Sequence, residues 1–276
     1  MSTILVLKLI LVPSLIWAAT VASRRWGPTV GGWLSAFPVI SAPILYIIAL
    51  EHGTAFAADA ALGTFSAVLA NVAFGISYAW IALRFSWSLG LVAGYLGYFL
   101  IIACLSFWTP SLYLAAPLVL TGLLVAPRLY PSLTSLATAP SKPANDLFWR
   151  MGAGALLVLL ITHFASALGP QLSGALAMFP VMASVLAVFS HRHSGSTFAV
   201  HILRGMALGY YAFGIFCVVL VLALPITTVG LAFLLSLGCA VLVHAISRIH
   251  LRRHQRANPE SARPASPPAA ARAIRR

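Results

Sequence analysis

Long apolar stretches, separated by short polar or Pro- and Gly-containing breaks, fill nearly the whole chain. Nine of them approach the length of about 20 residues that an α-helix needs to cross the hydrocarbon core of a bilayer. They lie at approximately 3–22, 28–50, 56–82, 85–107, 111–127, 149–168, 170–190, 198–223 and 226–247. The sequence therefore predicts an all-α integral membrane protein with about nine transmembrane helices.

Composition excludes a water-soluble globular protein. Of the 276 residues, 61% are hydrophobic and 8% are charged, and the mean hydropathy is +0.98. The 17 Lys and Arg with the four Asp and Glu are too few to cover the surface of a soluble protein of this mass, whereas lipid-facing helices need almost none. The lipid bilayer is thus the first predicted partner.

The basic residues between the predicted spans all fall on one side of the membrane. That side receives Arg24, Arg25, Arg84, Arg128, Lys142, Arg150, Arg192, Arg248 and an Arg-rich tail. The other side receives the N-terminus, the loop at 51–53 and the breaks near 109, 169 and 225, which contain no Lys or Arg. Because cytoplasmic loops carry the excess of Lys and Arg, we expect the N-terminus outside and the C-terminus inside. The compact loops and the Arg-rich, Lys-poor tail favour a bacterial inner membrane.

The two ends of the chain carry different signals. The first apolar stretch is expected to be an uncleaved helix, because no basic residue precedes it and Arg24-Arg25 follow it. Lys8, near its end, is expected to snorkel to the interface. Residues 251–276 hold seven Arg against one Glu and many Ala, Pro and Ser, so we expect a disordered basic arm that binds anionic lipid rather than nucleic acid.

An internal duplication appears when the chain is compared with itself at an offset of 142 residues. Gly27-Pro28 matches Gly169-Pro170, Phe37-Pro38-Val39 matches Phe179-Pro180-Val181, and the 37 positions from 27 to 63 contain 11 identities. Each copy has four spans with one unpaired span between them, so the copies are predicted to be antiparallel. The predicted units are 1–108 (repeat 1), 109–130 (connecting helix), 131–148 (cytoplasmic linker), 149–250 (repeat 2) and 251–276 (tail). Inverted repeats are characteristic of secondary transporters.

The repeated Phe-Pro pairs, Phe37-Pro38 and Phe179-Pro180, fall near mid-membrane in the second and seventh spans. A proline there removes one backbone hydrogen bond and clashes with the preceding turn. A helix broken at that depth exposes backbone groups that can hold an ion or an anionic solute. The alternative is that both prolines are packing kinks, which membrane helices tolerate.

Ionisable residues inside the spans are the other candidate binding groups. Asp59 and His201 are equivalent in the two copies, and Arg204 follows His201 by about one turn. Titration of Asp59 or His201 could couple a proton gradient to solute movement, or all three could be interfacial residues that snorkel. His163 could be a proton relay or a hydrogen-bonded core histidine. The run His191-Arg192-His193 lacks a nearby carboxylate or thiolate in sequence, so no metal site and no cofactor are predicted.

The second copy resembles the small GlpM-like inner-membrane proteins. The resemblance is carried by Gly174, Phe179-Pro180, Gly195, Leu203-Arg204 and Gly209, over about forty residues. Those proteins are about half as long as this chain, and they are associated with production of envelope polysaccharides. The first copy departs from the pattern, with Asp59 at the position of His201 and Leu62 at that of Arg204. The resemblance implies no catalytic residue.

Together these features predict a secondary transporter or exporter of a small solute, with an anion as one candidate, working by alternating access of inverted repeats. The alternative is a non-transporting accessory or assembly protein of envelope polysaccharide synthesis. The chain lacks a phosphate loop, a nucleophile elbow and paired intramembrane carboxylates, so we do not expect an enzyme. A homodimer is left open.

Overall fold

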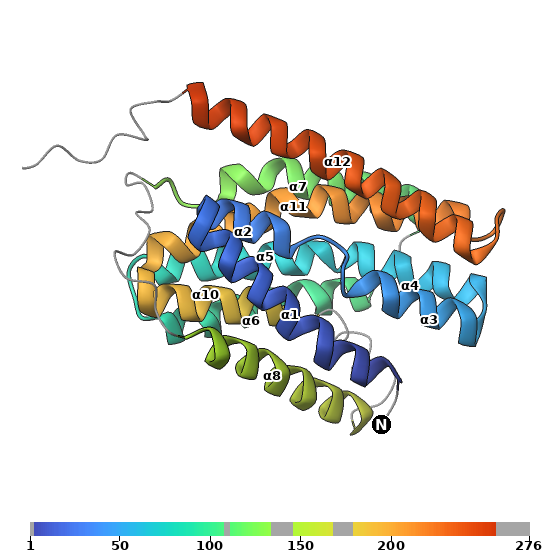
Figure 1. Cartoon of the computed structure of the whole chain (residues 1–276), viewed down its shortest axis with the longest axis horizontal. Helices are drawn as coiled ribbons and strands as arrows, with labels where there is room; N and C mark the ends of the chain where they lie inside the picture. Colours follow the sequence, from blue (N-terminus) through green and yellow to red (C-terminus); the bar gives the residue numbers. More distant parts are fainter. Residues whose placement is uncertain (1–2, 108–110, 134–145, 168–178, 258–276) are drawn as a thin grey trace, which may run out of the picture.

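The computed structural model describes residues 3–107, 111–133, 146–167 and 179–257, and within these ranges every regular element is an α-helix. The helices pack side by side in an elongated bundle, in which most of them run along the long axis (Figure 1). They are α1 (Thr3–Trp26), α2 (Pro28–Ser35), α3 (Ser41–His52), α4 (Thr54–Ser66), α5 (Val68–Ala82), α6 (Trp87–Ser106), α7 (Leu112–Leu129), α8 (Leu147–Ala167), α10 (Val181–Ser194), α11 (Ser196–Ala223) and α12 (Val229–Ala257).

Six helical segments of the described chain are long and apolar enough to cross a membrane. They are Leu5–Trp26, Thr54–Ala82, Trp87–Ser106, Leu112–Leu129, Ser196–Ala223 and Val229–Arg248. The outer helices α6 and α12 expose leucines such as Leu96 and Leu234, as lipid-facing helices do. The predicted helical membrane protein is therefore confirmed. The count of nine spans stays a prediction. The stretch at 28–50 is divided between α2 and α3, and α8 is apolar over the shorter range Leu147–Ile161. Of the predicted span 170–190, residues 170–178 lie outside the described residues.

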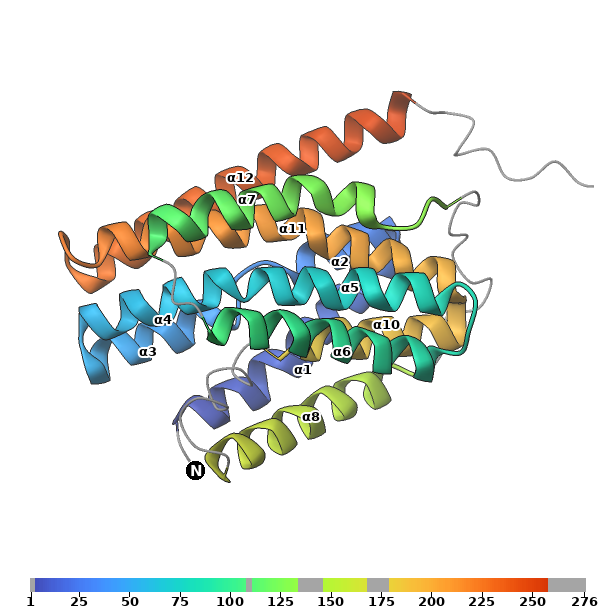
Figure 2. The same cartoon turned by 180° about the vertical axis from the view of Figure 1, so that it is seen from behind.

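Chain segments with basic residues gather at one end of the bundle, which we call the basic end. There α1, α5, α7, α10 and α12 end, and α6, α8 and α11 begin (Figures 1 and 2). Arg24, Arg128 and Arg192 lie in the last turns of α1, α7 and α10. The opposite end, called the far end, holds the start of α1 and the α3–α4 and α11–α12 junctions.

Two helices extend past the predicted boundaries of the tail and the linker. Helix α12 continues to Ala257, into the segment 251–276 that we expected to be a disordered arm. Helix α8 begins at Leu147, just inside the predicted linker 131–148. Lys142, the Gly169-Pro170 break and residues 258–276 lie outside the described residues.

Several elements correspond at the offset of 142 residues. The junction α3–Gly53–α4 matches α10–Gly195–α11, and the two glycines have nearly the same backbone angles, φ 86° and ψ 169° against φ 87° and ψ 165°. A positive φ of this kind suits glycine because it lacks a Cβ. The matched helices α1 and α8, and likewise α6 and α12, run in opposite directions (Figure 1). These correspondences support an inverted duplication.

Helix α11 lies at the centre of the bundle and is the most extensively buried helix. It packs closely against α2 and α12 and also touches α4, α5, α7 and α10. Its backbone approaches α2 directly: a Cβ added at Gly205 would collide with the Thr29 carbonyl oxygen, and one at Gly32 of α2 would collide with that of Ile202. Small residues permit such contacts between membrane helices. This packing fixes the position of α2, and hence that of the Phe37-Pro38 segment that follows α2.

Candidate functional site

Each Phe-Pro pair lies in a turn directly before a helix, α3 in the first case and α10 in the second. Helix α2 ends at Ser35 and α3 begins at Ser41, so the proline lies in a true break rather than a kink. In the first break the Val39 N–H donates to the Phe37 carbonyl at 2.7 Å, and in the second the Val181 N–H donates to Phe179 at 2.8 Å. Pro180, with φ −76° and ψ 55°, is the centre of an inverse γ-turn.

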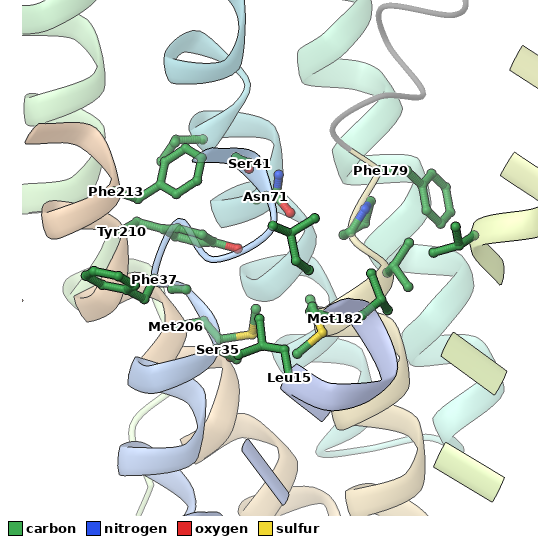
Figure 3. Close-up of a pocket in the computed structure, with 18 of the residues that line it drawn as sticks. Leu15, Ser35, Phe37, Ser41, Asn71, Phe179, Met182, Met206, Tyr210 and Phe213 are labelled. Atoms are coloured by element: carbon green, nitrogen blue, oxygen red, sulfur yellow. The ribbon is translucent and has the colours of Figure 1, made fainter. Parts of the chain in front are cut away.

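The two breaks meet at one cavity of about 140 Å³ (Figure 3). Phe37 lines it from the first break, and Phe179 and Pro180 line it from the second. Helices α1, α5, α8 and α11 supply further walls. Of the predicted mid-membrane site residues, the structure thus brings these three together, and Pro38 lies within the first break beside Phe37.

Half of the described wall of the cavity consists of residue pairs separated by 142 positions. These pairs are Phe37 and Phe179, Ile40 and Met182, Ser41 and Ala183, Val68 and Tyr210, and Asn71 and Phe213. Under the predicted duplication, a cavity lined by such equivalent positions lies where the two copies meet. Secondary transporters with inverted repeats bind their substrates at such a repeat interface, near the middle of the membrane.

Polar groups are few in the cavity and come from different helices. The Tyr210 side chain of α11 projects toward the Asn71 amide of α5, and Ser35 and Ser41 lie at the two ends of the first break (Figure 3). The Asn71 amide donates to the Ala67 carbonyl at 3.3 Å, and the Ser35 hydroxyl donates to Gly32 at 2.7 Å. Among the lining residues that the structure describes, Lys8 is the one charged residue. The site therefore suits a largely apolar solute with one polar or anionic group.

Aromatic contacts hold each break against an outer helix. The Phe179 ring lies 4.9 Å from Tyr95 and 5.8 Å from Tyr98 of α6, measured between ring centroids. The Phe37 ring lies 5.1 Å from the imidazole of His244 on α12. That imidazole stacks on Trp33 of α2 at 3.6 Å. Helices α6 and α12 correspond at the 142-residue offset, so the two breaks are held in equivalent ways.

The ionisable residues predicted for coupling do not line the cavity. Asp59 is exposed on α4, and His163 is exposed on α8. His201 and Arg204 lie in the early turns of α11, toward the basic end, and the Arg204 guanidinium lies 6.0 Å from the ring centre of Tyr130. Whether any of them carries protons stays a prediction.

An ion cluster at the basic end was missed by the sequence analysis. Asp146, just before α8, accepts from Arg24 of α1 at 2.6 Å and from Arg150 of α8 at 2.8 Å, and its carboxylate lies 3.3 Å from His193 Nδ1 of α10. Asp146 and Arg150 are only 4% and 5% exposed. The signal available in the sequence was that Asp146 is one of only four acidic residues in the chain.

The Asp146 cluster, composed of Asp146, Arg24, Arg150 and His193, ties three helices together. The Arg150 guanidinium also donates to Ser190 of α10 at 3.1 Å. The cluster borders a second cavity of only about 20 Å³ between α1, α8 and α10. Buried charges require such pairing because desolvation is costly. The cluster therefore closes the bundle at its basic end.

His191, near the basic end, contacts a tyrosine and does not belong to a metal-binding group among the described residues. His191 Nδ1 lies 3.1 Å from the Tyr78 hydroxyl, and burial lowers the pKa of His191 below its ordinary value, which favours the neutral ring as an acceptor. Within the described ranges, no three His, Cys, Asp or Glu side chains are grouped so that they could hold a metal ion.

No known protein-family model matches the chain, and no curated protein or solved structure does so. The resemblance to the GlpM-like proteins thus stays a prediction from the quoted residues.

Proposed function

We propose that this protein is a secondary transporter that moves a small solute through the central cavity by alternating access of two inverted four-span repeats. The observation that carries the proposal is the meeting of both Phe-Pro breaks at one cavity with paired lining positions. Broken helices at a repeat interface are the usual construction of substrate sites in such transporters. A bacterial inner membrane, with the basic end in the cytoplasm, agrees with the clustering of arginines at one end.

The cavity favours a small organic anion as the solute. Its volume of about 140 Å³ is close to that of an engineered cavity of about 150 Å³ that binds benzene in another protein. Apolar side chains form most of the wall, and Lys8 provides a positive charge with no carboxylate among the described lining residues. Helices α3 and α10 also begin at the breaks, and the first N–H groups of a helix have no intrahelical partner.

Flux into proteoliposomes tests this function. The purified chain would be reconstituted, and uptake of radiolabelled acetate, benzoate and phosphate would be measured with and without a pH gradient. We expect benzoate uptake, its loss in Lys8→Met, and its retention in Arg128→Met, which removes a cation outside the cavity. Asp59→Asn, His201→Gln and Arg204→Gln should alter the response to the pH gradient if these residues couple protons.

Absence of flux for all three probes would contradict the transport proposal. Co-purification with an envelope polysaccharide enzyme would then favour the alternative of an accessory protein.

A further inference from the structure

The two ends of the bundle are packed differently, although equivalent helices form them. At the basic end α8 packs against α10, whereas at the far end the equivalent helices α1 and α3 touch only sparsely. Figures 1 and 2 show the start of α8 beside the end of α10, and the start of α1 apart from the end of α3. Among the described helices, the structure is therefore closed at the basic end and less closed at the far end.

Each residue at the basic end has an equivalent at the far end, which lies 142 positions earlier in the sequence. Arg150 becomes Lys8, and His193 becomes Glu51. Arg150 and His193 both reach the same Oδ2 atom of Asp146, at 2.8 and 3.3 Å, so these two positions converge when their end is closed.

The equivalent pair is apart in this structure. Lys8 lines the central cavity, whereas its counterpart Arg150 is sealed in the Asp146 cluster. The Glu51 side chain is exposed in the last turn of α3. In the described part of the chain, neither Lys8 nor Glu51 forms an ion pair.

We propose that Lys8 and Glu51 form an ion pair that closes the far end when the two repeats exchange conformations. The proposal rests on the transport function proposed above, because inverted repeats alternate by adopting each other's conformations. Arg150 and His193 both carry positive charge when protonated and need Asp146 between them. Lys8 and Glu51 have opposite charges, so they can pair directly, and the position equivalent to Asp146 is the uncharged Ile4.

The two closures are unequal in strength. At the basic end one buried carboxylate contacts three partners on three helices, whereas at the far end the proposed closure is a single Lys–Glu pair. Ion pairs with additional hydrogen-bonded partners hold better than isolated pairs near a surface. The protein without solute should therefore populate the conformation seen here, and weakening the Asp146 cluster should shift the population toward closure at the far end.

Cross-linking of paired cysteines tests the proposal. In a chain without its native cysteines, Lys8→Cys with Glu51→Cys reports whether these two positions approach each other at the far end, although the charges of the pair are absent from this variant. The matched control, Ser23→Cys with Ser194→Cys, reports the basic end, since both serines line the small cavity there. We expect the control pair to cross-link in the protein as described and the 8–51 pair to cross-link weakly. Asp146→Asn should raise the 8–51 yield severalfold and lower the 23–194 yield.

A 23–194 yield that falls without any rise of the 8–51 yield would overturn the proposal. If Asp146→Asn fails to elute as a folded protein in gel filtration, His193→Leu weakens the same cluster while leaving the Arg24 and Arg150 pairs intact. Flux is measured in the same cysteine-free chain that keeps Lys8 and Glu51, because Lys8 lines the cavity, and it separates the two ideas. Flux without 8–51 cross-linking under any condition refutes the ion pair alone, and alternating cross-linking without flux of any probe refutes the transport function alone.

Discussion

The direct contact between α2 and α11 makes Gly205→Ala the sharpest test of the packing. A Cβ at position 205 would collide with the carbonyl oxygen of Thr29, which is a backbone atom of the neighbouring helix. No change of side-chain rotamer can relieve that collision, so α2 would have to move away. Because α2 leads directly into the break at Phe37, the cavity wall would move with it.

The magnitude follows from two opposing effects. Overpacking a well-packed interior costs about 1–3 kcal/mol, and replacing glycine by alanine within a helix contributes about 0.5–1 kcal/mol in favour of folding. We therefore expect Gly205→Ala to lower the free energy of unfolding by about 1–2 kcal/mol. Gly238→Ala on the exposed face of α12 is the control, since no described atom beyond the adjacent backbone of α12 lies within 4 Å of a Cβ there. This variant should be neutral or slightly stabilising.

Unfolding in mixed micelles of increasing denaturing detergent, followed by tryptophan fluorescence, measures both variants under identical conditions. Benzoate flux gives a second reading, which should fall for Gly205→Ala and stay unchanged for Gly238→Ala. Equal stability of the two variants would refute the close approach of α2 and α11, and with it the placement of the first break.

Two further predictions concern buried polar groups. Asp146→Asn leaves the Arg150 side chain, which is 5% exposed, without its carboxylate partner. It should lower the free energy of unfolding by about 3–5 kcal/mol. Adding Arg150→Met should recover most of that loss in a double-mutant cycle. His244→Phe should keep the stack on Trp33 and remove two buried ring nitrogens that have no hydrogen-bond partner among the described residues. The midpoint of thermal unfolding should therefore stay equal or rise. A clear fall would show that the imidazole makes a polar contact needed for folding.

The elements of the fold were predictable because they depend on local and repeated signals. Apolar length predicts membrane helices, and Phe37-Pro38 predicted the site of the break between α2 and α3, while Phe179-Pro180 lies directly before α10. The polar groups of the cavity were not predictable in this way. Asn71 and Tyr210 are paired with Phe213 and Val68, so they are positions where the copies differ, whereas the search for the duplication used positions where they agree.

The burial of the charged residues could not be predicted from the sequence either. Asp59 was selected because it interrupts an apolar stretch, yet it lies on an exposed face of α4. Asp146 was overlooked because it precedes a span, yet the meeting of α1, α8 and α10 buries it. Which face of a membrane helix is turned inward depends on packing between helices, and these apolar helices carry little periodicity that would reveal it.

Under the proposed mechanism, the positions at which the two copies differ decide which conformation predominates. Under the proposed mechanism, the two end conformations are related by an exchange between the repeats, and they should therefore be close in energy. Substitutions at equivalent positions then decide between them, since a gap of a few kcal/mol sets which conformation predominates. Arg150 is held in a buried ion cluster, whereas its counterpart Lys8 lines the cavity. Under the proposed mechanism this difference should favour the conformation that is closed at the basic end.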